Sequence, residues 1–96
     1  MATYIVLMNW TEQGIKNVKD SPKRLDAARE GAKKLGCELS SFFMTIGPYD
    51  AVGVLEAPND EALAKFALAT GAAGSVRTTT LKAYKEDAYR KIMASL

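Results

Sequence analysis

The chain opens with a segment whose apolar residues occupy both sides of an extended strand. Residues 3–8 are rich in strand-forming side chains, which alternate in direction along the segment: Tyr4, Val6 and Met8 on one side, Ile5 and Leu7 on the other. A strand with one side facing water normally keeps that side polar. This segment is therefore predicted to be a central strand of a sheet.

Two later segments repeat apolar residues at the spacing of a helix. The first is predicted to run from Ser21, as the N-cap, to Gly36, because glycine favours the end of a helix. The second is predicted to begin with a cap at Asn59 or Asp60 and to end near residue 73. Each predicted helix therefore has one apolar side, which we expect to pack against a sheet.

Three further strands and a last helix complete the predicted order βαββαβα. The strands span residues 38–46, 50–57 and 76–84, and the helix spans residues 86–95. Right-handed crossovers then place two helices on one face of a four-stranded antiparallel sheet in the order 4-1-3-2, which is the ferredoxin-like arrangement. We expect residues 1–96 to form a single α+β domain, a ferredoxin-like βαββαβ sandwich with an extra C-terminal helix.

The sheet face turned away from the helices has nothing in the sequence to cover it. Like the first strand, the second is predicted to be apolar on both faces, with Leu39 and Phe43 on one and Phe42 and Met44 on the other. Two copies of the chain would cover these faces by packing their sheets together, about 10 Å apart. A homodimer is therefore predicted, and a higher homo-oligomer built from such dimers is compatible with it.

Composition excludes several classes of chemistry. The chain has 96 residues, a net charge of +2, no histidine and a single cysteine, Cys37. Without histidine it has no Ser-His-Asp or Cys-His catalytic centre and no Cys/His zinc site, and Cys37 is expected to be an inert small hydrophobic residue. A phosphate-binding glycine loop is also missing, so neither a metal nor a cofactor is expected.

The same composition bears on location and partners. No apolar run approaches the roughly 18–20 residues that span a bilayer, and no signal-peptide pattern is visible, so a soluble, cytoplasmic protein without a membrane partner is expected. A charge of +2 is too small for a general nucleic-acid binder. The strand over residues 50–57 also lacks the aromatic residues with which RNA-binding domains of this topology stack on bases. Nucleic acid is therefore not expected as a partner.

One stretch of the chain carries a resemblance to a known family. Gly47-Pro-Tyr-Asp50, the strand after it and Pro58-Asn-Asp60 closely resemble the GYD-domain family, which is named for its G-x-Y-D motif. Further segments look like family segments: Asn9-Trp-Thr11, Gln13-Gly-Ile15, Lys19-Asp20, Ser21-Pro-Lys-Arg-Leu25 and Ser75-Val-Arg-Thr78. The resemblance covers nearly the whole chain and implies a prokaryotic, ferredoxin-like domain of the dimeric α/β-barrel type. It implies no particular activity.

The candidate ligand site lies where two unusual segments are expected to meet. The connection over residues 9–20 is longer than the roughly two to six residues usual between a strand and a helix, and Thr11 is predicted to cap a short helical turn within it, with Ile15 and Val18 packing inward. This connection is expected to meet the hairpin turn at residues 47–50 beside the sheet. The residues predicted to bind a ligand there are Tyr4, Trp10, Tyr49, Asp50 and Arg77.

Several of these residues also have a purely structural interpretation. Asp50 either accepts backbone hydrogen bonds in the turn or works with Tyr49 at a pocket mouth, and Trp10 is either a core residue or a pocket wall. Arg77 either meets an anionic group of a ligand or pairs with Glu56, which otherwise closes its strand at the surface. An unpaired Arg77 predicts an anionic ligand, and a paired one predicts a largely apolar ligand.

Two functions remain open from the sequence. The first, which we favour, is a small-molecule binding or sensing module that uses a pocket between helices and sheet or between paired sheets. The alternative is a cofactor-independent enzyme of the isomerase or oxygenase type, which rests on analogy with other dimeric barrels and has no histidine to support it. The sequence leaves open whether the chain is an enzyme.

Overall fold

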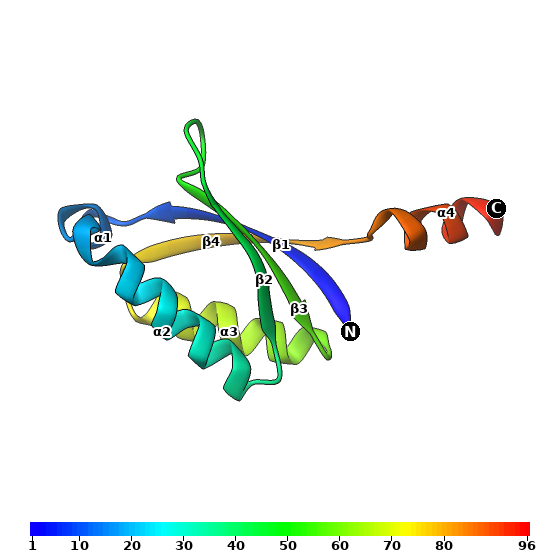
Figure 1. Cartoon of the computed structure of the whole chain (residues 1–96), viewed down its shortest axis with the longest axis horizontal. Helices are drawn as coiled ribbons and strands as arrows, with labels where there is room; N and C mark the ends of the chain where they lie inside the picture. The colour runs from blue at the N-terminus through cyan, green and yellow to red at the C-terminus, as the bar shows by residue number, and fades with distance from the viewer.

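A single antiparallel sheet forms the centre of the computed structural model, which describes residues 1–96 (Figure 1). Its four strands are β1 (Ala2–Trp10), β2 (Glu38–Met44), β3 (Ala51–Ala57) and β4 (Val76–Ala83). They lie in the order β2-β3-β1-β4, with every neighbouring pair antiparallel. The predicted strand order is confirmed, and the arrangement is compatible with a ferredoxin-like fold.

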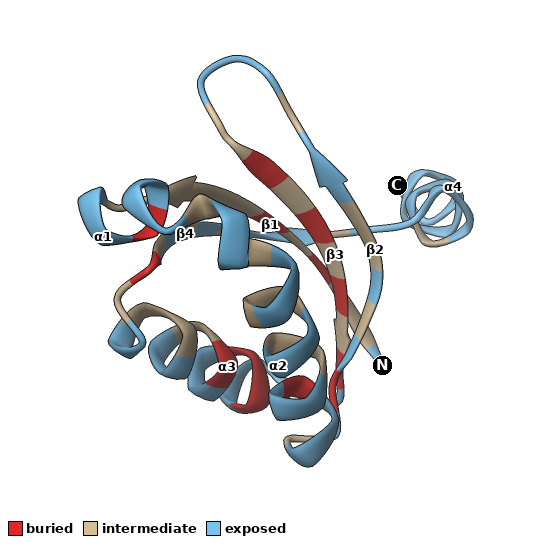
Figure 2. Ribbon diagram, turned by 60° about the vertical axis from the view of Figure 1, so that its left-hand side comes forward, coloured by how far each residue is buried: buried red, intermediate tan, exposed pale blue.

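Two helices cover one face of this sheet. They are α2 (Ser21–Lys34) and α3 (Asp60–Ala72), and Figure 2 shows both on the same side of the sheet. Two shorter helices lie outside this layer, α1 (Glu12–Lys16) before α2 and α4 (Glu86–Ala94) at the C-terminus. None of the helices is both long and apolar enough to cross a membrane. The predicted α+β order is therefore present, with the extra C-terminal helix.

The two covering helices begin in different ways. The side chain of Asn59 caps α3 by accepting a hydrogen bond from the backbone N–H of Ala62, at 2.9 Å. The prediction that Ser21 caps α2 is wrong, because Ser21 is already the first residue of that helix and Asp20 before it makes no side-chain cap. A 3-10 helix, η1 (Val18–Asp20), leads directly into α2, so the residues before α2 already have a helical backbone.

An irregularity in β2 changes which side chains meet the helices. The pairing of β2 with β3 shifts in register between Leu39 and Ser41, as in a β-bulge. Because one extra residue reverses the alternation, Leu39 lies on the same face as Phe42 and Met44, and Phe43 points to the other face. The predicted pairing of Leu39 with Phe43 on one face is therefore wrong.

The buried core lies toward one end of the layer between sheet and helices. Along β3, buried residues alternate with partly buried ones, as Figure 2 shows. Leu55 and Ala57 are inaccessible to solvent there, and so is Ala32 of α2. Cys37 is also buried, and burial raises the pKa of its thiol, which disfavours the reactive thiolate and agrees with the expectation of an inert small hydrophobic residue.

The opposite face of the sheet is left open by the chain. Its apolar side chains come from all four strands: Ile5, Leu7, Phe43, Val52, Val54 and Leu81. Phe43 is 60% exposed and Leu81 is 49% exposed. We call this set the outer face and the helix-covered set the inner face.

Candidate functional site

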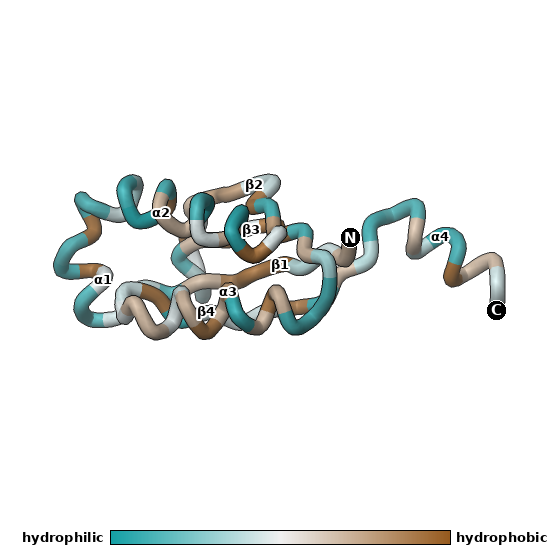
Figure 3. Tube along the Cα trace, turned by 90° about the horizontal axis from the view of Figure 1, so that it is seen from below, coloured by the Kyte–Doolittle hydropathy of each residue, from teal (hydrophilic) through white to brown (hydrophobic).

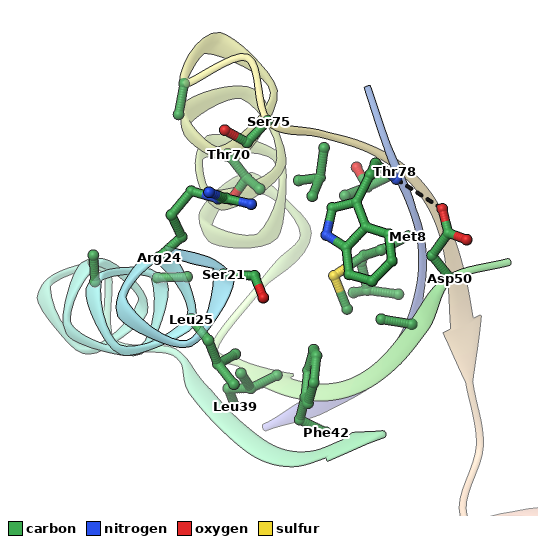
Figure 4. A pocket seen from close by; sticks show the side chains of 18 of the residues that line it. Met8, Ser21, Arg24, Leu25, Leu39, Phe42, Asp50, Thr70, Ser75 and Thr78 are labelled. Atoms are coloured by element: carbon green, nitrogen blue, oxygen red, sulfur yellow. Dashed lines mark hydrogen bonds between the residues drawn. The ribbon is translucent and has the colours of Figure 1, made fainter. Parts of the chain in front are cut away.

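A cavity of about 550 Å³ lies between the inner face and the two covering helices. Sixteen of the 24 residues that line it are hydrophobic, and Figure 4 shows some of them, including Met8, Leu25 and Phe42, around the open space. The helices contribute mostly small residues to its wall, among them Ala28 of α2 and Ala69 of α3. Small side chains on the helices therefore leave unfilled the volume that larger ones would occupy.

The connection between β1 and α2 runs beside this cavity and contributes Val18 to its wall. As predicted, Thr11 caps the short helix α1, because its hydroxyl accepts a hydrogen bond from the Gly14 N–H at 3.1 Å. The same hydroxyl donates to the Gly74 carbonyl at 2.5 Å, and the Thr11 N–H donates to the Ser75 carbonyl at 3.1 Å. These bonds fasten the long connection to the start of β4.

Close backbone contact continues at Gly14, which is buried against Ser75. A Cβ at Gly14 would lie 1.9 Å from the Ser75 carbonyl oxygen, so only glycine fits there. Val18 of η1 lines the cavity, as predicted. The matching prediction for Ile15 is wrong, because its side chain is 50% exposed.

Arg24 is the only cationic side chain that lines the cavity. Its Nη1 donates to the carbonyl of Asn17 at 2.9 Å and its Nη2 donates to the carbonyl of Gly14 at 3.3 Å. Since a guanidinium has five N–H donors, these two bonds hold the group in place and leave other donors available. The hydroxyl-bearing residues Ser21, Thr70 and Ser75 also line the cavity (Figure 4).

Asp50 is the only carboxylate that lines the cavity, and Figure 4 shows it across the open space from Arg24. Its Oδ2 accepts a hydrogen bond from the backbone N–H of Trp10 at 2.9 Å. Its own N–H donates to the carbonyl of Met8 at 2.8 Å, and its carbonyl accepts from the Thr45 N–H at 2.9 Å. Asp50 therefore joins the hairpin to the end of β1, which supports its structural interpretation, while it also borders the cavity.

The structure brings together only two of the five residues predicted to bind a ligand. Trp10 and Asp50 line the cavity. Tyr49 lies in the hairpin loop, away from the cavity wall, and its carbonyl accepts a hydrogen bond from the Thr45 hydroxyl at 2.6 Å. Tyr4 is buried in the packed core beyond the cavity.

The hydroxyl of Tyr4 donates a hydrogen bond to the carboxylate of Asp60, at the start of α3. This bond is the main cause that raises the pKa of Tyr4 to about 12, with burial and the charge of Asp60 adding to it. The same bond, together with Lys82, lowers the pKa of Asp60. Tyr4 therefore joins β1 to α3. This is a structural role, and the sequence alone could not distinguish it from ligand binding.

The prediction that Arg77 shares the pocket is corrected by its position in the sheet. Arg77 pairs in register with Asn9, so its exposed side chain belongs to the outer face. Glu56 pairs with Thr3 at the opposite end of β1, so the suggested ion pair between Arg77 and Glu56 is not formed. Instead the Oε1 atom of Glu56 accepts from the Thr3 hydroxyl at 2.7 Å and lies 3.5 Å from the Lys85 ammonium.

Arg24 was not predicted from the sequence as a cavity residue, although its helical spacing indicates that it lies on the same side of the helix as an apolar residue. Arg24 precedes Ala28 by four residues, which places both on neighbouring turns of one helix side. The helix carries several other basic residues, so charge alone does not single it out. No group of three or more His, Cys, Asp or Glu side chains in the structure is placed to hold a metal ion.

Comparisons with known proteins agree with this architecture. The family model described as the GYD domain matches residues 4–93. The chain is 33% identical over 84 residues to the Glutamine synthetase and cystathionine beta-lyase binding protein of Thermus thermophilus, an alignment that covers 86% of this chain and 88% of that protein. It is also similar in fold to the crystal structure of TTHA0845 from Thermus thermophilus, with a TM-score of 0.56, 24% identity, and coverage of 88% of this chain and 95% of the other.

Proposed function

The chain belongs to the GYD domain family, and we propose that it binds a small, mainly apolar molecule with one anionic group in the cavity between sheet and helices. The observation that carries this proposal is the cavity itself. Its volume of about 550 Å³ lies within the range of about 300–1,000 Å³ typical of small-molecule sites. Its apolar wall with a few convergent polar groups is also typical of such sites.

The charged group of the ligand is expected at the Arg24 side of the cavity. The guanidinium is fixed by two carbonyl oxygens, and neither of them neutralises its charge. A carboxylate or a similar anion would supply the missing charge and would accept the remaining N–H donors. Asp50 across the cavity repels such a group, so the apolar part of the ligand points toward Asp50 and the anion points away from it.

A thermal-shift titration with decanoate and with decanol tests this orientation. We expect decanoate to raise the melting temperature of the wild type and to have a much smaller effect on Arg24→Met, because the variant keeps the apolar stem and loses the charge. Decanol has no charge and is expected to act equally on both proteins. Lys23→Met is the matched control, since Lys23 is an exposed neighbour on the same helix. Equal responses of wild type and Arg24→Met to decanoate would contradict the proposal.

The binding module is further proposed to act as a homodimer of the dimeric α/β-barrel type, with two outer faces packed together. One chain exposes 6526 Å², whereas a monomeric protein of 10.4 kDa is expected to expose roughly 5,400 Å². The excess of roughly 1,100 Å² exceeds the roughly 800 Å² that each partner buries in a standard stable interface. Light scattering that gives the mass of one chain at micromolar concentration would contradict the dimer.

A second candidate function is the binding of a partner enzyme, and the name of one relative favours it. The Thermus thermophilus protein is named as a binding protein for glutamine synthetase and cystathionine beta-lyase. We infer that this chain recognises an enzyme of the same kind through exposed apolar surface. Biolayer interferometry with both enzymes from the organism that encodes the chain tests this, and the absence of binding to either would remove this candidate.

A further inference from the structure

The C-terminal helix α4 stands apart from the rest of the chain. Figures 1 and 3 show it beyond the end of β4, away from α2 and α3. All of its nine residues except Ala88 are exposed, and the helix has no extensive contact with another element. Nothing within the chain therefore accounts for its position.

The sequence of α4 nevertheless has the amphipathic pattern of a helix that packs against an apolar surface. Tyr89, Ile92 and Met93 recur at helical spacing, so they form one apolar side, while Ala94 falls on the opposite side. Isolated helices shorter than about 12–15 residues are marginal in water, and α4 has only nine. A stable α4 needs an apolar surface against this side.

A second unsupported surface lies on the hairpin that joins β2 and β3. Ile46, in the loop of this hairpin, is 97% exposed, and Phe43, near the end of β2, is 60% exposed on the outer face. Met44 is 69% exposed as well, but it points to the inner face, where it borders the cavity. Figure 1 shows this hairpin and α4 as separate projections from the body of the molecule. One chain therefore carries a helix with an exposed apolar side and a hairpin with exposed apolar residues, and no other part of the same chain covers either of them.

We propose that α4 of one copy packs against the β2–β3 hairpin of a second copy. In a two-fold dimer each chain supplies one helix and receives one, so the same contact forms twice and covers the helix and the hairpin of both chains. This closed exchange also uses the excess exposed area of the single chain. The inference rests on the homodimer proposed above, and it adds that α4 is the element that contacts the partner chain.

Charge substitutions on α4 and on the hairpin test the exchange by light scattering of the full chain. We expect Ile92→Asp and Ile46→Asp each to weaken the dimer by at least about tenfold, because each buries a charge at the contact. Ala94→Asp, on the polar side of α4, and Leu68→Asp, at an exposed position of α3, carry the same charge change and are expected to keep twice the mass of one chain.

Disulfide pairing between differently tagged chains identifies the two contacting surfaces. A mixture of Ile46→Cys chains with Ile92→Cys chains is expected to form a mixed-tag dimer on oxidation, and a mixture with Ala94→Cys chains is expected to form much less. The native Cys37 is buried and does not compete.

Three outcomes would overturn the exchange: a dimer unaffected by Ile92→Asp, a disulfide formed within one chain when both cysteines are introduced together, or a monomeric wild type. The decanoate response of Ile92→Asp separates this test from the cavity proposal, since α4 contributes no residue to the cavity wall. If Ile92→Asp responds to decanoate as the wild type does, the ligand-binding proposal is supported, whether or not the helix exchange is confirmed.

Discussion

The layer between the sheet and the covering helices is packed at one end and open at the other, and the two ends are held in different ways. At the packed end Leu55 and Ala57 of β3 meet Ala32 of α2, and all three are inaccessible to solvent. At the open end larger residues of the strands, such as Met8 and Phe42, face the cavity. Side-chain packing therefore stabilises the first end and does not explain the second.

Hydrogen bonds to the backbone hold the open end. Thr11 bonds to Gly74, Arg24 bonds to Gly14, and Asp50 bonds to Trp10. These contacts fix the rim of the cavity without filling its interior. The empty volume therefore lies between elements that specific hydrogen bonds hold together, whereas the packed end is held by side-chain contacts.

The largest expected effect tests the packed end. Leu55→Ala should lower the free energy of unfolding by about 3–4 kcal/mol, because it leaves a cavity at a fully buried position. Leu25→Ala, on a half-buried cavity wall, should lower it by only about 1 kcal/mol, because the volume beside it is already empty. Urea unfolding of both variants provides the measurement. Equal losses would remove the contrast between the two ends.

The next effect tests the bonds at the open end. Gly14→Ala should lower the free energy of unfolding by about 2–3 kcal/mol, because its Cβ would collide with the Ser75 backbone carbonyl and one of the two backbones would have to shift. Gly71→Ala is the matched control, since an added Cβ there meets no atom within 4 Å. A Gly14→Ala protein as stable as its control would show that the rim is not held as tightly as the hydrogen bonds indicate.

A third, smaller effect concerns the packed end at alkaline pH. The pKa of Tyr4 is raised from about 10 to about 12, so between these values the folded protein keeps a proton that the unfolded chain releases. Stability should therefore be fully present below about pH 10 and should fall as the pH rises toward about 12.

Urea midpoints measured from about pH 9 to about pH 12 check this limb. Tyr4→Phe should be less stable at neutral pH, because it loses the bond to Asp60, and should lose less stability as the pH rises. Tyr84→Phe, at an exposed position, is the control and should follow the wild type. Parallel pH curves for Tyr4→Phe and wild type would exclude Tyr4 as the titrating group.

Much of the packed end could be predicted from the sequence, because its determinants are local. Alternation along residues 3–8 gave the two faces of β1, helical spacing gave α2 and α3, and Asn59 was identified as a possible cap. These features depend on neighbours within a few positions of the chain. The strand order followed from the ferredoxin-like arrangement that the order of elements predicts, and the handedness of crossovers placed both helices on one face.

The open end could not be predicted in the same way, because it depends on register between distant segments. The side of the sheet that Arg77 occupies follows from its pairing with Asn9, and the bulge after Leu39 reverses the faces of β2. Neither appears in a local pattern. Arg24 was missed for a related reason, since its bond to Gly14 depends on how the 9–20 connection folds over the helix.

The smallest expected effect tests whether the cavity accepts added atoms. Gly31 lies within α2 on the cavity wall, and a Cβ there would meet no atom within 4 Å. Gly31→Ala should raise the free energy of unfolding by about 0.5–1 kcal/mol, because alanine restricts the unfolded chain and favours the helix without a clash. Thermal unfolding should show a rise of roughly 2–8 °C. A fall in melting temperature would mean that the space beside Gly31 is already filled in solution, and the same measurement repeated after extraction with organic solvent would then show whether a bound apolar molecule fills it.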